Sequence, residues 1–170
     1  MNSKALYNLS YGLYLVSSKK GDNQNNAQVA NTVFQVTSEP ATIAISINKG
    51  NFTWECIKES GIFAVSVLQQ DTPLAFIGNF GFKSGRDIDK LVGINFKIGQ
   101  TGAPIITDNA NAYFEASLTK ELDAGTHTLF IGKLEDADVL NNKPGMTYAY
   151  YHEVKRGTTP RSAPHYIKEG

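Results

Sequence analysis

Residues 42–47 carry the clearest strand pattern in the chain, and this pattern limits the folds open to it. Isoleucine occupies positions 43, 45 and 47, whereas Thr42, Ala44 and Ser46 alternate with them. Because successive side chains of a strand point to opposite faces, the pattern predicts one core face and one small, partly polar face. The small face leaves room for a flat ligand, although it can equally pack under a helix.

Other segments show strand patterns separated by turn residues. The tract at 19–26 is polar and predicts a hairpin turn that returns the chain into the Asn-rich segment 26–40, which itself has the pattern of a β-hairpin. Amide and hydroxyl side chains in this segment suit the edge of a polar ring system such as a flavin. Gly125 and Thr126 predict the turn of a second long hairpin. We expect strands at residues 13–18, 62–68, 112–119 and 127–135.

Two short helices are predicted between these strands. Asn51 or Thr53 can cap the first, and Gly61 suits its left-handed end. The second begins with Thr72 as N-cap and Pro73 at the first helical position, and its inward-facing residues are expected to be Leu74, Ile77 and Phe80. We therefore expect a mainly β fold, a Greek-key-like antiparallel barrel with a few short helices over its openings.

Composition limits the domain count and the partners. A chain of 170 residues with 41% hydrophobic content predicts one domain, residues 1–170, in which residues 152–170 form a C-terminal extension. Lys plus Arg equals Asp plus Glu at 16 each, so no overall field favours nucleic acid or an anionic membrane. Cys56 is the only cysteine, and no apolar run is long enough for a secretory or membrane segment. We expect a soluble, cytoplasmic protein without a metal site.

Several polar features could bind an anion. The N-terminus of the first helix offers free N–H groups beside Lys49 and Thr53. The loop at 81–87 combines a flexible backbone with two cations and a hydroxyl. Each feature alone is weak, because most capped helices bind water and most such loops are solvated turns. His127 opens a strand near the expected barrel rim and titrates near physiological pH, although a lone histidine there is more often an ordinary surface residue.

Taken together and in order, these segments resemble the flavin reductase-like, FMN-binding split-barrel family. The likeness is carried by residues 31–40, 46–53, 61–68, 82–87 and 127–132, and it runs nearly end to end. Residues 146–152 and 155–164 are most similar to the flavin module of high-molecular-weight rubredoxins, with flavoredoxin and ferric reductase as near relatives.

The resemblance implies a homodimer with one FMN per subunit near the interface. His127 would lie near the flavin, Phe34 would pack in the pocket, and Tyr151 or Tyr166 would cover the exposed face of the ring. The ring and ribityl would contact two strand segments, whose residues are Gln28, Val29, Ala30, Asn31, Thr32, Ser46, Ile47 and Asn48. The phosphate would be held by residues of the first helix and the following loop, namely Thr53, Phe82, Lys83, Ser84 and Arg86.

The implied activity is an NAD(P)H-dependent oxidoreductase that reduces FMN and passes electrons to a separate acceptor. High-molecular-weight rubredoxins continue into a rubredoxin with paired Cys-x-x-Cys ligands, and this sequence has no such pair. A rubredoxin-like protein, free flavin and ferric iron are therefore the candidate acceptors. Two alternatives remain: an electron carrier reduced by a protein partner, and a binding module without redox activity. Lys155, Arg156 and Arg161 could dock an acidic partner, although a solvated basic tail explains them equally.

Overall fold

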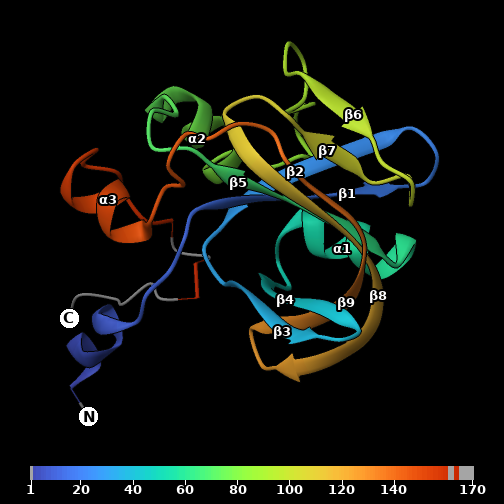
Figure 1. Cartoon of the computed structure of the whole chain (residues 1–170), viewed down its shortest axis with the longest axis horizontal. Helices are drawn as coiled ribbons and strands as arrows, with labels where there is room; N and C mark the ends of the chain where they lie inside the picture. Colours follow the sequence, from blue (N-terminus) through green and yellow to red (C-terminus); the bar gives the residue numbers. More distant parts are fainter. Residues whose placement is uncertain (1, 161–162, 165–170) are drawn as a thin grey trace.

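The computed structural model describes residues 2–160 and 163–164, and it confirms the predicted mainly β, antiparallel fold with a few short helices (Figure 1). The helices are the 3-10 helix η1 Ser3–Asn8, α1 Phe52–Ser60, α2 Leu74–Gly81 and α3 Tyr148–Glu153. The strands are β1 Tyr14–Lys20, β2 Gln24–Ala30, β3 Val33–Ser38, β4 Ala41–Asn48, β5 Ile62–Leu68, β6 Phe96–Ile98, β7 Pro104–Ile106, β8 Ala110–Ala124 and β9 His127–Val139.

Seven strands form one sheet in the order β2-β1-β5-β8-β9-β4-β3, and β6 pairs with β7 in a separate sheet. Every pairing is antiparallel. The long strands β8 and β9 curve from the half of the molecule that contains β1 and β5 to the half that contains β3 and β4 (Figure 1). Although β2 and β3 follow each other in sequence, they occupy opposite edges of the sheet, so the link at residues 31–32 joins its two ends.

The core lies inside this curved sheet and confirms the predicted apolar face of β4. Ile43, Ile45 and Ile47 are buried in one cluster with Phe63 and Phe130. Gly132 on β9 allows this packing, because a Cβ at that position would lie 2.7 Å from the Phe63 ring. A second cluster joins α2 and α3 to β1 and β5, and its largest side chains include Leu13, Leu68, Ile77, Phe80 and Tyr151.

The first hairpin is confirmed, but its turn is shorter than expected. β1 and β2 pair as far as Lys20 opposite Gln24, so most of the polar tract at 19–26 belongs to strands. Polar side chains are tolerated there because the hairpin end is exposed, and Gly21 supplies the positive φ of the turn. The hairpin pattern of segment 26–40 is confirmed for its second half, because β3 pairs with β4 across the turn at residues 39–40, whereas β2 lies at the opposite edge of the sheet.

Both predicted helices are present; α1 begins at one of its two predicted caps, whereas the N-terminus of α2 differs from expectation. Asn51 is the N-cap of α1, whereas Thr53 lies within the helix and is buried. Pro73 takes the N-cap position of α2 in place of Thr72, whose hydroxyl donates to the main-chain oxygen of Gln69. Gly61 ends α1 at φ 69°, as expected. The predicted inward position of Leu74 is wrong, because that side chain is 45% exposed.

Several elements were not expected from the sequence. The strands β6 and β7 contain three residues each, which is too short for a readable alternation. Helix α3 is a six-residue helix capped by the Thr147 hydroxyl, which accepts from the N–H of Tyr150. The assignment of residues 1–170 to one domain stays a prediction, and the expected start of the C-terminal extension at residue 152 falls inside α3.

Candidate functional site

One cavity of about 430 Å³ lies where strands β2 and β4 meet the N-terminus of α1, the end of α2 and the C-terminal segment. Its volume is in the range of small-molecule and cofactor sites. Most of the predicted site residues line it: Gln28, Val29, Ala30, Asn31, Ser46, Asn48, Thr53, Phe82, Lys83, Ser84, Arg86, His127 and Tyr151. The fold thus brings together segments that lie far apart in sequence.

Three of the predicted site residues that the structure describes are not among those lining the cavity. Ile47 is buried in the core because it alternates with Ser46 and Asn48. Phe34 is 49% exposed on the edge strand β3, and its packing against a flavin stays a prediction. Thr32 contributes its main-chain oxygen, which accepts from the N–H of Ser46 at 3.1 Å and links the two cavity-lining strands. Tyr166 lies outside the described residues.

One end of the cavity is formed by the N-terminus of α1. Gly50, Asn51, Phe52 and Thr53 all line it, and the first N–H groups of a helix have no partner within the helix. The Asn51 side chain makes no capping bond. Thr53 does not face solvent, since its Oγ1 accepts a 2.7 Å hydrogen bond from the buried amide of Asn26. This end therefore presents N–H groups and the positive end of the helix dipole.

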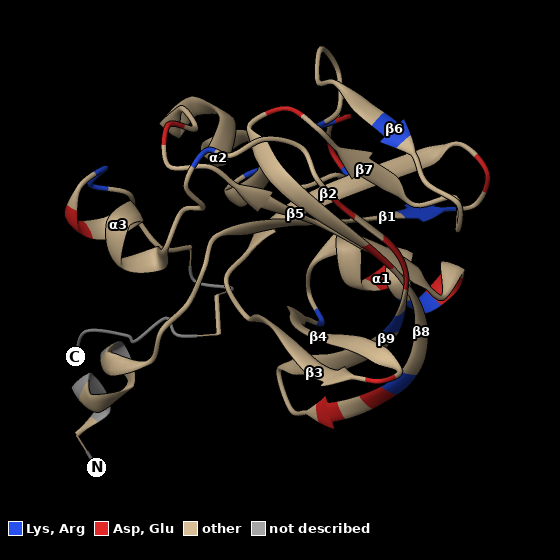
Figure 2. Ribbon diagram, in the orientation of Figure 1, with Lys and Arg blue, Asp and Glu red and all other residues tan. Residues whose placement is uncertain are grey.

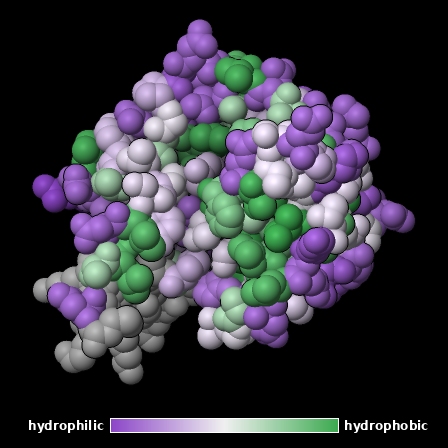
Figure 3. Space-filling model, turned by 60° about the horizontal axis from the view of Figure 1, so that its bottom comes forward, coloured by the Kyte–Doolittle hydropathy of each residue, from purple (hydrophilic) through white to green (hydrophobic). Residues whose placement is uncertain are grey.

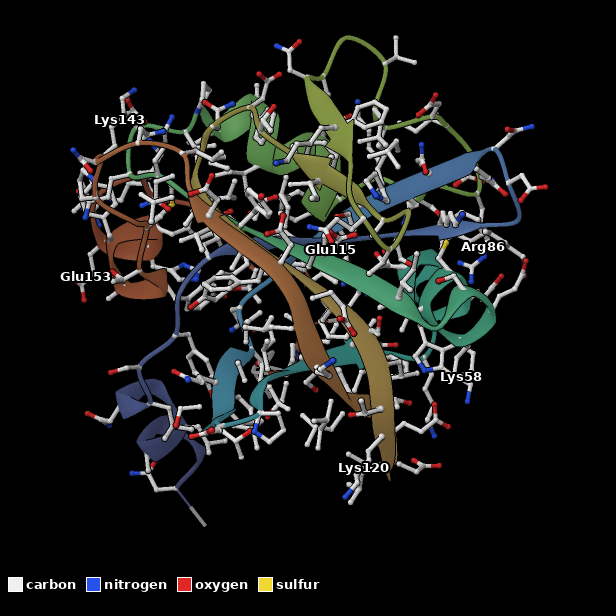
Figure 4. All side chains as sticks on the ribbon, turned by 45° about the vertical axis from the view of Figure 1, so that its right-hand side comes forward. Lys58, Arg86, Glu115, Lys120, Lys143 and Glu153 are labelled. Atoms are coloured by element: carbon white, nitrogen blue, oxygen red, sulfur yellow. The ribbon has the colours of Figure 1, made fainter. Side chains whose placement is uncertain are left out.

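The loop after α2 is tied to the same helix by Arg86. Its guanidinium donates to the main-chain oxygen of Gly50 at 3.0 Å and to the Glu55 carboxylate, and it lies beside α1 (Figure 4). Glu55 also pairs with Lys20 at 3.1 Å. The hydrogen bond from Arg86, together with that from Lys20, lowers the pKa of Glu55. Because Glu55 shares the charge of Arg86, we assign this arginine mainly to holding the loop in place.

The structure adds a buried cation to this end of the cavity. Lys90 lines the wall and is only 4% exposed. Its Nζ donates to the main-chain oxygens of Lys83 at 3.3 Å and Phe80 at 3.5 Å. None of the ion pairs found among the described residues includes Lys90, and burial lowers its pKa to about 8. A buried ammonium without a carboxylate is costly, and an anion in the cavity would offset that cost.

The sequence does not identify Lys90 as a buried residue of the cavity, because a lysine after a charged loop is usually exposed. Asn26 was also not predicted as a site residue, although its position could have indicated it. It lies two residues before Gln28 on β2, so the two side chains share the face that lines the cavity.

A second wall of the cavity is built from the small face of β4 and the start of β9, and it continues directly into the N-terminus of α1, where the N–H of Asn51 donates to the main-chain oxygen of Asn48 at 3.0 Å. Ser46 and Asn48 line it, and His127 pairs directly with Asn48 in the sheet register. The Nδ1 of His127 lies 2.8 Å from the Thr126 hydroxyl. Trp54 fixes α1 against this strand through a 2.8 Å hydrogen bond from its Nε1 to Thr128. Ser46, on the small face of β4, lines the cavity, which agrees with the expectation that this face leaves room for a ligand.

The C-terminal segment forms a further wall of the cavity. Tyr151 on α3 is buried, and its hydroxyl donates to the main-chain oxygen of Thr158 at 3.0 Å. Gly157 packs directly on the Tyr151 ring, so a Cβ there would clash. The Thr159 hydroxyl contacts His152 Nε2 at 3.2 Å, and burial lowers the pKa of His152. These contacts hold residues 158–160 against the cavity.

These residues fit a phosphorylated flavin. The α1 N-terminus, Lys83 and the buried ammonium of Lys90 suit a phosphate, while hydroxyl and amide groups of β2 and β4 suit a polar ring edge. No group of three metal-ligating side chains occurs in the described part of the chain. Burial raises the pKa of Cys56 to about 11, so its thiol is protonated and poorly reactive.

Within residues 2–160 and 163–164, no helix is long and apolar enough to cross a bilayer. Acidic side chains outnumber basic ones along the β8–β9 hairpin (Figure 2). The cytoplasmic location and the lack of nucleic-acid and membrane partners stay predictions from composition.

Comparison with known proteins agrees with the geometry. The family model described as "Flavin reductase like domain" matches residues 6–159. The chain is 57% identical over 164 residues to the high molecular weight rubredoxin of Moorella thermoacetica, covering 96% of this chain and 71% of that protein. It is 48% identical over 168 residues to the ferric-chelate reductase (NAD(P)H) of Archaeoglobus fulgidus, covering 99% of each.

Solved structures show the same fold. The flavoredoxin of Desulfovibrio vulgaris (Miyazaki F) superimposes with a TM-score of 0.69 at 26% identity, over 76% of this chain and 70% of that one. An NADH:FAD oxidoreductase of Streptomyces globisporus superimposes with a TM-score of 0.76 at 22% identity, over 86% and 85% of the two chains. By its sequence and its fold, the chain is a flavin reductase-like oxidoreductase and belongs to the flavin reductase-like domain family.

Proposed function

We propose that this protein binds FMN, takes electrons from NADH or NADPH, and passes them to a separate acceptor. The observation that carries this proposal is the polarity of the cavity. Cationic and N–H groups from α1 and the loop after α2 line it together with small polar side chains of β4 and with His127. The relative from Archaeoglobus fulgidus, a ferric-chelate reductase (NAD(P)H) that is similar over its whole length, supports a nicotinamide donor.

Bound FMN would supply a group that accepts a hydride and releases electrons one at a time. The protein would then need to hold, orient and shield it. Lys83, Lys90 and the first N–H groups of α1 would bind the phosphate, and Ser84 would add a hydroxyl donor. Ser46, Asn48 and the segment 28–31 would orient the ring by its polar edge.

His127 would lie close to the ring and stabilise negative charge on it by donating a hydrogen bond or by its own positive charge. Tyr151 and the segment 158–160 would exclude water from one side of the site. No side chain is required as a general acid or base, because the hydride donor and the electron acceptor exchange electrons through the cofactor.

The relatives support different electron acceptors. The high molecular weight rubredoxin relative supports a rubredoxin-like protein, and the ferric-chelate reductase supports chelated iron. The likeness to flavoredoxin supports a second candidate function, an electron carrier that a protein partner reduces.

We also propose that the protein is a homodimer. The edge strand β3 exposes Phe34 and Val36, and Leu122 is exposed near the end of the β8–β9 hairpin. Figure 3 shows an apolar region on the lower side of the molecule, which bears β3. A second copy would bury this surface. Analytical sedimentation of the wild type and of the double variant Phe34→Glu, Val36→Glu tests this proposal. We expect the wild type to be a dimer and the double variant to be a monomer. A monomeric wild type would contradict the proposal.

Turnover under anaerobic conditions tests the oxidoreductase activity. The FMN-loaded protein should oxidise NADH or NADPH when ferric chelate, free flavin or rubredoxin is added. It should consume two ferric ions per nicotinamide, because a hydride carries two electrons. Nicotinamide oxidation that is no faster than with free FMN would contradict the enzymatic function and favour the carrier.

A further inference from the structure

One wall of the cavity is built from a short irregular segment after α3, residues 157–160, here called the strap. Thr158 and Pro160 line the cavity, whereas Thr159 between them does not. The strap is not paired into the sheet or wound into a helix. Its position at the cavity therefore depends on individual contacts with its neighbours.

These contacts attach the strap to α3. Each hydrogen bond found for residues 157–159 within the described part of the chain reaches this helix. The N–H of Gly157 donates to the main-chain oxygen of Tyr151 at 2.9 Å, and the Tyr151 hydroxyl donates to the main-chain oxygen of Thr158 at 3.0 Å. Because Tyr151 is buried in the core cluster with α2, the strap is attached to a fixed support.

Thr159 attaches the strap through its side chain. Its hydroxyl bonds to the hydroxyl of Tyr148 and lies 3.2 Å from the Nε2 of His152. The rings of these two partners are in edge-to-face contact, with their centres 4.2 Å apart. A hydroxyl donates one hydrogen bond and can accept others, so Thr159 can serve both partners at once.

An attachment of this kind can open without unfolding the sheet. Each neutral hydrogen bond favours the bonded state by only about two- to tenfold. The strap makes few such bonds and no strand pairing, and segments of this type open locally at much lower cost than the core. Opening of a wall segment controls the exchange of a ligand between a cavity and solvent.

We propose that Thr159 is a positioning residue that latches the strap against the cavity and thereby sets how fast FMN enters and leaves. This inference rests on the proposed flavin site. Thr159 acts through Thr158 and Pro160, which line the cavity on either side of it in sequence. A latched strap keeps FMN in place over many turnovers, so that the acceptor takes electrons from bound flavin.

Stopped-flow flavin fluorescence tests the latch by measuring the association and dissociation rates of FMN. Thr159→Val keeps the shape of the side chain but removes the hydroxyl. Because the strap must open for both entry and exit, we expect both rates to rise about fivefold or more. The dissociation constant should change by less than about twofold, because the strap remains mostly closed with and without FMN.

Two further variants serve as controls. Thr159→Ser keeps the hydroxyl and should retain the wild-type rates. Thr119→Val also removes a hydroxyl that donates to a main-chain oxygen, that of Ile131, but it lies on β8 and does not line the cavity. It should change neither rate. Thermal melts of each variant check that the fold is retained.

The other outcomes separate this inference from the proposed function. A faster dissociation with an unchanged association rate in Thr159→Val would show that Thr159 shapes the bound site and does not gate it. Unchanged rates would overturn the latch, as would FMN dissociation from the wild type that is faster than turnover. Failure of the folded wild type to bind FMN would instead contradict the proposed function itself.

Discussion

The Nζ of Lys90 lies 3.3 Å from the main-chain oxygen of Lys83. The buried Lys90 therefore holds the loop that presents Lys83 to the cavity. The same ammonium reaches the main-chain oxygen of Phe80, at the end of α2. Because both contacts are with carbonyls, they orient the cation without neutralising it. This arrangement links the shape of the loop to the charge of the site.

Substituting Lys90→Met should weaken FMN binding much more than riboflavin binding. Methionine keeps most of the buried volume but removes the charge, and a hydrogen bond to a charged group contributes about 1.5–3 kcal/mol. We expect the FMN dissociation constant to rise about tenfold or more, measured by flavin fluorescence. Lys155→Met is the matched control, since its Nζ also donates to a main-chain oxygen, that of Gln70, but outside the cavity. A parallel loss of riboflavin affinity would show a structural role only.

Lys90 should also make the stability of the flavin-free protein depend on pH. Burial lowers its pKa from 10.5 to about 8, so between these values the unfolded chain binds a proton that the folded chain does not. Stability should therefore rise with pH across this window, by up to about 3 kcal/mol, and the penalty is fully present below pH 8. Urea unfolding at pH 7.5 and 10 measures it, and Lys90→Met should remove the difference. An identical pH dependence in the variant would contradict the assignment.

Thr53→Val should destabilise the fold and the anion-binding end together. Valine has the same shape but leaves the buried Asn26 amide without its acceptor, a loss of about 1–3 kcal/mol. Thr53→Ser keeps the hydroxyl and should retain most of that stability. Chemical unfolding compares the three proteins, and FMN titration reports whether the site follows. Wild-type stability in Thr53→Val would show that this hydrogen bond contributes little.

Gly132→Ala should destabilise the core without touching the cavity. Its methyl group would lie 2.7 Å from Phe63 and 2.9 Å from the Ala116 Cβ, and overpacking of this kind costs about 1–3 kcal/mol. Gly78→Ala is the control, because open space surrounds that position on α2 and alanine favours a helix. Thermal melts should show a lower Tm for the first variant and an unchanged or higher Tm for the second. Equal Tm values would contradict the packing at Phe63.

The parts of the fold that could be predicted are those with a clear period or a strong turn residue. The isoleucines of β4 alternate strictly, and Gly61 and Gly125 mark element ends, so these segments were placed correctly. β6 is too short to show a period. The start of α2 differs from the prediction because the Thr72 hydroxyl bonds to the main-chain oxygen of Gln69, outside the helix, which local capping rules do not anticipate.

Most of the residues that the family resemblance supplied line the cavity, whereas tertiary packing decides where the others lie. Ile47 was grouped with Ser46 and Asn48, although alternation directs its side chain into the core. Lys90 could not be predicted, because only the folded loop buries its ammonium against two carbonyls. Burial of a charge is a property of the whole fold, and a single sequence does not show it.

The visible spectrum of the FMN-loaded protein, recorded anaerobically before and after NADH and then NADPH, tests the central claim most directly. The proposed phosphate site at α1 and the proposed ring site at β4 predict flavin bands that bleach with at least one of the two donors. Bands that persist with both would contradict the oxidoreductase and leave an electron carrier. No flavin bands after gel filtration of the protein with FMN would contradict the site itself.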